Sequence, residues 1–243
     1  MAEPAMQQEA PRNLLEVHDL HGWYGESHIL HGMSFALAEG QVTTLVGRNG
    51  VGRTTTLRAI MGILPRRKGS ITFSGRELIG LSSDRIARAG IAYCPEERGI
   101  FASLDVEENL MLPPVVREGG MSVEEIYTLF PNLKERRRSQ GTRLSGGEQQ
   151  MLAIGRILRT GANLLLLDEP TEGLAPVIVE QIGHAIDILK QRGFTILLVE
   201  QNIHFVAALG DRHYLVDHGS VVGAVTRAQL GEDPEILGRH LAI

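Results

Sequence analysis

The segment that decides the fold is Gly47-Arg48-Asn49-Gly50-Val51-Gly52-Arg53-Thr54-Thr55. It follows a strand-like apolar run at residues 42–46 and precedes a helix-like run that starts at Thr56. Its glycines let successive backbone N–H groups surround phosphate oxygens, and the N-terminus of the following helix adds partial positive charge. The pattern is G-x-x-x-x-G-K-[ST], except that Arg53 stands where lysine is expected. We therefore expect this segment to form a loop that binds a nucleotide triphosphate.

The composition limits the classes of function. The 243 residues carry a net charge of −5, so no basic patch favours nucleic acid as a partner. A single cysteine, Cys94, excludes an internal disulfide and fits a reducing compartment. Residues 1–13 are polar and lack the apolar centre of a signal peptide, so we expect a flexible N-terminal tail. No apolar run reaches the roughly 20 residues that span a bilayer, so the chain has no transmembrane segment of its own and a membrane role requires a partner.

The order of the remaining segments predicts an α/β fold. Residues 14–20 and 29–37 alternate like antiparallel strands, whereas short apolar runs are typical of buried parallel strands. Residues 105 to about 144 differ, because they contain helix-like segments and no obvious strand. We interpret this region as a helical subdomain inserted into a layered core. The expected buried strands are 42–46, 91–94, 163–168 and 195–200, and the expected helices are 53–62, 83–88, 106–112, 123–129, 145–159 and 177–192.

Two adjacent carboxylates, Asp168 and Glu169, follow the apolar run at residues 164–167. A buried strand that ends in this way brings both side chains to the carboxyl edge of a parallel sheet, where α/β proteins bind ligands. We expect Asp168 and the hydroxyl of Thr54 to hold Mg²⁺, and Glu169 to act as general base toward the attacking water. The alternative is a strand end with solvated acids, which the phosphate-binding loop upstream disfavours.

A third motif is Leu144-Ser145-Gly146-Gly147-Glu148-Gln149-Gln150. Ser145 is a natural N-cap, and Gly146 and Gly147 leave backbone amides accessible at a helix start, which makes a second anion site. One chain then carries two phosphate-binding edges far apart in sequence. A symmetric head-to-tail dimer resolves this, because each phosphate-binding loop closes on the Ser-Gly-Gly segment of the other subunit. The alternative is a simple capped helix.

These three motifs together resemble the nucleotide-binding subunits of ABC transporters, from about residue 14 to the C-terminus. Residues 47–50, 95–101, 106–110, 172–176 and 198–202 are similar to the LivF-type subunits of branched-chain amino acid importers. The resemblance implies one ABC ATPase domain at 14–243, a P-loop NTPase (RecA-like) core with an N-terminal antiparallel β subdomain and an inserted helical subdomain. It implies hydrolysis of ATP with Mg²⁺, membrane-spanning permease partners, and a homodimer or a heterodimer with a paralogous ATPase subunit. It also implies a peripheral location on the cytoplasmic face of the inner (plasma) membrane.

The resemblance further implies roles for single residues. Tyr24 lies where the family places an aromatic ring that stacks on adenine, with core packing as the alternative. Glu96 takes the position of the Q-loop glutamine, where a carboxylate can still bind Mg²⁺ and take part in catalysis. Gln201 takes the position of the switch histidine, from which its amide can donate to the γ-phosphate but cannot carry a proton. Ala175 replaces the usual aspartate of the D-loop, and LivF-type subunits often show these three departures.

Arg53 leaves a second function open. Its guanidinium can pair bidentately with phosphate oxygens, but it is longer and flatter than a lysine ammonium, and catalysis needs the charge where the transition state develops it. A working ATPase is the main expectation, and a weakly hydrolysing or binding-only subunit paired with an active paralogue is the alternative. An ABC ATPase that acts on ribosomes or DNA is disfavoured by the single uninterrupted cassette. The subtype alone suggests branched-chain amino acids as cargo, so urea, short amides and other amino acids remain open.

Overall fold

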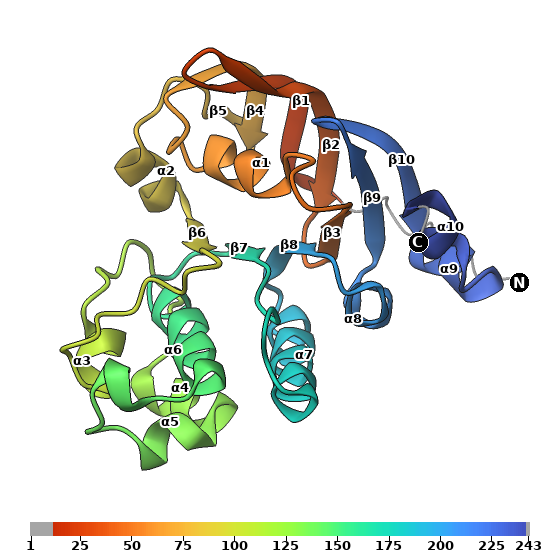
Figure 1. Ribbon diagram of the computed structural model, residues 1–243. Coiled ribbons are helices and arrows are strands. Elements are labelled where there is room, and N and C mark those ends of the chain that lie inside the picture. The colour runs from red at the N-terminus through yellow and green to blue at the C-terminus, as the bar shows by residue number, and fades with distance from the viewer. Residues whose placement is uncertain (1–11, 242–243) are drawn as a thin grey trace, which may run out of the picture.

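The computed structural model describes residues 12–241 and contains two β-sheets (Figure 1). The 4-stranded sheet is antiparallel with the order β2-β1-β4-β5, and the 6-stranded sheet has the order β10-β9-β3-β8-β7-β6. Strands β6, β7, β8, β3 and β9 run parallel to one another, whereas β10 is antiparallel to β9. The strands are β1 (Asn13–Tyr24), β2 (Ser27–Ala38), β3 (Val42–Val46), β4 (Arg66–Phe73), β5 (Arg76–Glu77), β6 (Ile91–Cys94), β7 (Leu164–Asp168), β8 (Thr195–Glu200), β9 (Arg212–Asp217) and β10 (Ser220–Thr226).

The centre of the 6-stranded sheet is buried on both faces. Every residue of β3, β7 and β8 is buried, which explains why these strands read as continuous apolar runs. Successive side chains of β7 enter different cores: Leu164 and Leu166 belong to the cluster that includes β1, β2 and α1, and Leu165 and Leu167 to the cluster on the other face. The predicted buried strands and the α/β class are thereby confirmed.

Helices fill the space on both faces of this sheet. Helix α1 (Arg53–Ile60) lies between the two sheets and contacts β1, β2 and β7 (Figure 1). On the other face lie α6 (Gly146–Leu158), α7 (Pro176–Gln191) and α8 (Ile203–Leu209). The remaining helices of the core are α2 (Ser83–Ala89), which precedes β6, and α9 (Arg227–Glu232) and α10 (Ile236–Leu241), which follow β10.

Residues 105–144 form helices and no strand. They contain α3 (Val106–Met111), α4 (Val123–Leu129), α5 (Pro131–Glu135) and a 3₁₀ turn, η1 (Gly141–Arg143). Helix α6 packs against α3 and α5, and a Cβ on its Gly155 would lie only 3.0 Å from Ile126 and 3.1 Å from Leu110. Helix α6 also contacts β6, so it connects the helices of residues 105–144 to the 6-stranded sheet (Figure 1).

The structure differs from the sequence prediction at the N-terminus and in the number of strands. The predicted N-terminal tail is too long, because Asn13 already belongs to β1 and lies opposite Ala38; residues 1–11 lie outside the described part of the chain. Strands β4, β5, β9 and β10 were not predicted. β4 opens with Arg66, Arg67 and Lys68, and β10 is half exposed, so neither has the apolar run or the strict alternation that marks a strand in sequence.

Candidate nucleotide site

The segment 47–55 connects the buried end of β3 to the start of α1. Gly50 and Gly52 adopt positive φ angles of 82° and 105°, and a Cβ on Gly47 would lie 2.4 Å from the carbonyl oxygen of Val216. Gly52 provides no side-chain cap, so the backbone N–H groups at the start of α1 are left to another acceptor. A cavity of about 340 Å³ opens beside this helix end; it is lined by Asn49, Gly50, Gly52, Arg53, Thr54, Thr55, Glu96, Glu169 and Glu172.

Asp168 is fixed by two hydroxyl groups at the end of β7. The Thr54 hydroxyl donates to Oδ1 at 2.9 Å, and the Tyr93 hydroxyl donates to Oδ2 at 2.8 Å. Burial raises the pKa of Asp168, and these two hydrogen bonds act in the opposite direction. The predicted pair Thr54 and Asp168 is therefore in direct contact. Tyr93 was missed by the sequence reasoning, and the only signal for it was its place in β6, which pairs with β7.

Glu169 lies beside Asp168 with a strained backbone, at φ 44°. Arg53 Nη2 donates to Glu169 Oε1 at 2.8 Å and to Asn49 Oδ1 at 3.0 Å. Burial raises the pKa of Glu169, Arg53 opposes that change, and Glu172 and Glu200 add to it. The residue that departs from the lysine pattern thus contacts the expected general base directly.

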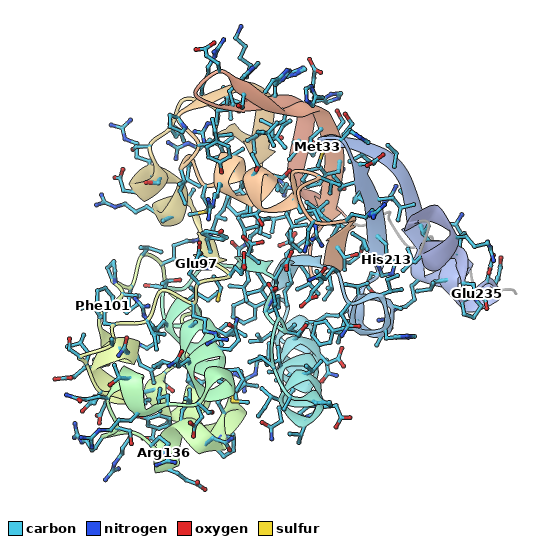
Figure 2. The ribbon with its side chains drawn as sticks, viewed as in Figure 1. Met33, Glu97, Phe101, Arg136, His213 and Glu235 are labelled. Carbon is cyan, nitrogen blue, oxygen red and sulfur yellow. The ribbon has the colours of Figure 1, made fainter. Side chains whose placement is uncertain are left out.

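Two more carboxylates, Glu96 and Glu172, line the same cavity. The pKa of Glu96 is raised, first by burial and then by Glu172, Asp168 and Glu97. Glu97 itself points elsewhere, to Arg58 at 3.2 Å, and lies where β6 leads toward the helical group (Figure 2). The sequence pattern marks Glu172 only as part of the family segment 172–176. Its position just after the carboxyl end of β7 could also have indicated a site residue.

Tyr24 lies outside this cavity, at the end of β1. Its side chain is 42% exposed, which contradicts the alternative that it packs in the core. A hydrogen bond with Tyr24 is the largest of the effects that raise the pKa of Arg58 on α1, and a second one comes from Tyr93. The Tyr24 ring is therefore available to a flat ligand near the phosphate-binding loop.

The third motif is not brought to the cavity within one chain. Ser145 caps α6: its hydroxyl accepts from the N–H of Glu148 at 3.3 Å, and Glu148 Oε2 accepts from the N–H of Ser145 at 2.7 Å. Ser145 is exposed, and neither it nor Gly146 and Gly147 line the cavity. Gln201 is also exposed and follows β8 outside the cavity lining. These residues can meet the nucleotide only if the site closes or a second subunit supplies them.

Comparison with known proteins identifies the family. The family model described as ABC transporter matches residues 30–172, which include the phosphate-binding loop, the Ser-Gly-Gly segment and the Asp168-Glu169 pair. The chain belongs to the ABC transporter family. It is the ATP-binding cassette of that family, and family membership supports hydrolysis of the bound nucleotide.

Curated relatives agree with this assignment over most of the chain. A "High-affinity branched-chain amino acid transport ATP-binding protein BraG" of Pseudomonas aeruginosa is 41% identical over 222 residues, which cover 90% of this chain and 95% of the relative. A "Probable branched-chain amino acid transport ATP-binding protein LivF" of Archaeoglobus fulgidus is 36% identical over 225 residues, with 90% and 94% covered. The cassette is therefore homologous to the ATP-binding subunits of branched-chain amino acid importers, as the sequence motifs predicted.

Solved structures share the fold. A structure described as an ATP-binding subunit of an ABC transporter superposes with a TM-score of 0.78 at 28% identity and covers 95% of this chain and 100% of its own. A nucleotide-free cassette from an ABC transporter gives a TM-score of 0.79 at 22% identity, with 93% and 98% covered. No helix among residues 12–241 combines the length and apolar character that crossing a membrane requires.

Proposed function

We propose that this cassette hydrolyses ATP to energise an importer for branched-chain amino acids or related small amino acids and amides. The observation that carries the proposal is one cavity lined by an uncapped helix N-terminus, by the Glu169 carboxylate and by Thr54, whose hydroxyl donates to Asp168. Anion-binding amides, oxygen ligands for a cation and a base for water are the three requirements of phosphoryl transfer to water. The names of the two amino acid importer relatives support the choice of cargo.

The nucleotide would be held by backbone and side-chain groups of the phosphate-binding loop. The N–H groups of residues 47–55 and the guanidinium of Arg53 would contact the phosphates, and Tyr24 would stack on adenine. Thr54 and Asp168 offer a hydroxyl and a carboxylate oxygen within 2.9 Å of each other, which is the donor set that Mg²⁺ prefers, and Glu96 would add a third oxygen donor. Mg²⁺ bound there would offset charge on the phosphates during the reaction.

Glu169 would take the proton of the attacking water. A buried carboxyl group whose pKa is raised is a better proton acceptor than a solvated one, because its conjugate acid is weaker. Gln201 would donate its amide hydrogen to the γ-phosphate. Gln201 would then position the phosphate without exchanging a proton, so of these two residues only Glu169 could transfer one.

A second subunit would complete each site. At the start of α6, Ser145 is exposed and Gly146 partly exposed, whereas Gly147 is buried. A head-to-tail neighbour could place this helix start against the phosphates bound by the first chain. The dimer would be a homodimer or a heterodimer with a paralogous subunit, and it would work on the cytoplasmic face of the inner membrane with permease partners. The helical group and the segment around Glu96 would transmit closure of the dimer to those partners.

The test is phosphate release by the protein reconstituted with its permease. Glu169→Gln should lower the turnover of ATP about 100-fold or more, because general-base catalysis contributes at least that factor. Glu232→Gln, an exposed glutamate on α9, is the matched control and should leave turnover unchanged. Unchanged turnover in Glu169→Gln would refute the role of the base. Nucleotide binding without phosphate release in the wild-type protein would instead favour the binding-only alternative.

A further inference from the structure

The Arg53–Glu169 ion pair is the most buried pair of opposite charges in the nucleotide site. The two side chains are 3% and 9% exposed, and their atoms Nη2 and Oε1 lie 2.8 Å apart. The pair joins the first residue of α1 to the residue just after β7, and Asn49 Oδ1 holds the same Nη2 from the phosphate-binding loop. A charge-assisted contact with this little solvent is costly to break without a replacement, because one charge is then left buried and uncompensated.

The same guanidinium has a second nitrogen without an acceptor. Nη1 of Arg53 is buried, and no atom of residues 12–241 accepts a hydrogen bond from it. A buried donor of a charged group is costly to leave unpaired. Arg53 also lines the cavity in which the phosphates are expected, so an anion there would satisfy the unpaired donor. Arg53 therefore binds Glu169 through Nη2, while its Nη1 is available to a ligand.

We propose that Arg53 is a positioning residue for Glu169, and that it holds this carboxylate against the phosphate-binding loop until nucleotide arrives. Phosphate oxygens then draw the guanidinium away from Glu169, and the freed carboxylate can turn to the attacking water. The inference rests on the proposed function, since it assigns a regulatory step to the same site. Binding of nucleotide and release of the base are coupled because one guanidinium serves both anions.

Arginine suits this exchange better than lysine. Its planar fork presents several N–H donors in fixed directions, so Nη2 can serve Asn49 and Glu169 while Nη1 faces another partner. A lysine ammonium has its three donors on one nitrogen, so it cannot hold Glu169 and reach a phosphate from two separate atoms. The arginine at residue 53 thus has a specific consequence: it binds the proposed base, Glu169, before nucleotide arrives.

Binding of ATP without turnover tests the exchange. With excess EDTA to prevent hydrolysis, isothermal titration calorimetry should show that Glu169→Gln binds ATP about tenfold more tightly than wild type, because no charged pair must be broken. Glu172→Gln is the matched control: it removes one negative charge from the same cavity but leaves the Arg53–Glu169 contact intact. It should tighten ATP binding less than Glu169→Gln does, because the Arg53–Glu169 pair must still be broken.

A double-mutant cycle on the nucleotide-free protein tests the pair by itself. Urea unfolding of Arg53→Met, Glu169→Gln and the double variant should be non-additive by about tenfold in the unfolding constant, since each single change leaves a buried group uncompensated. If Arg53→Met does not fold, Arg53→Gln replaces it. Additive effects would overturn the proposal, and so would equal tightening of ATP binding by Glu169→Gln and Glu172→Gln. Absence of ATP binding in wild type, Glu169→Gln and Glu172→Gln would refute the proposed function itself. That result differs from equal tightening in the two variants.

Discussion

His213 makes the stability of this cassette depend on pH, and the size of the effect follows from its surroundings. The side chain lies on β9, which pairs with the strand that leads into the phosphate-binding loop, and it is 0% exposed (Figure 2). Its Nδ1 lies 2.9 Å from Thr44 Oγ1, while Nε2 has no hydrogen-bond partner within residues 12–241. Burial lowers the pKa of His213 to about 4; Arg227 acts in the same direction and Asp211 opposes it.

The sign follows from proton linkage. The unfolded chain binds a proton at this histidine with a pKa of 6.5, whereas the folded chain does so only near 4. Between these values the unfolded state holds more protons, so stability decreases as the pH falls from about 6.5 toward 4. At pH 5 the two pKa values correspond to a loss of about 2 kcal/mol relative to pH 7.5.

Urea unfolding at pH 7.5 and pH 5.0 measures this loss. The free energy of unfolding of His213→Gln should fall by about 2 kcal/mol less than that of wild type between the two pH values, whatever the absolute stability of the variant. His218→Gln, whose side chain is 92% exposed at the turn after β9, is the control and should keep the wild-type response. An equal loss in wild type and His213→Gln would refute the reasoning; His213→Asn is the second variant if the glutamine does not fit.

Two further predictions concern the nucleotide site. Tyr24→Ala should weaken ATP binding about 2- to 10-fold through loss of stacking, while Tyr24→Phe should bind like wild type in the same calorimetric titration; equal losses in both variants would contradict a stacking role. Gly47→Ala should destabilise the protein by about 1–3 kcal/mol and weaken ATP binding, because its Cβ would lie 2.4 Å from Val216 O. Gly231→Ala, on α9 with no heavy atom within 4 Å of the added Cβ, is the control for thermal unfolding and should not be destabilised; equal shifts would show that the close contact is not the cause.

The sequence predicted those parts of the fold and site that depend on local pattern. The buried runs gave β3, β6, β7 and β8 because a strand covered on both faces is mostly apolar on both sides and does not alternate. The Thr54–Asp168 contact was also predictable, because a loop after one central strand and the end of another meet at the same edge of a parallel sheet. Family resemblance supplied the remaining expectations, including Tyr24 and Gln201, whose roles stay predictions.

Contacts that depend on pairing between distant segments could not be predicted from the sequence. Tyr93 reaches Asp168 only because β6 lies beside β7, and Glu172 enters the cavity only through the turn that follows β7. Strands β4 and β10 carry charged or small residues on exposed positions, so their pattern resembles that of loops until a partner strand is known. The direction of the Arg53 side chain is a choice among rotamers, and no sequence pattern specifies that choice.

Two features of the cassette link its proposed catalysis to phosphate. The Ser145 segment lies outside the cavity, so in the proposed dimer it would reach the triphosphate bound by the other subunit. Glu169 is paired with Arg53, so the proposed base has no free carboxylate until an anion competes for the guanidinium. In the proposed mechanism a triphosphate would act on both features, because it would attract the guanidinium of Arg53 from one side and the glycine-rich helix start of the other subunit from the other. If each step had a separate trigger, water could be activated before the dimer closed; a shared trigger ties release of the base to the same phosphates that bring the subunits together.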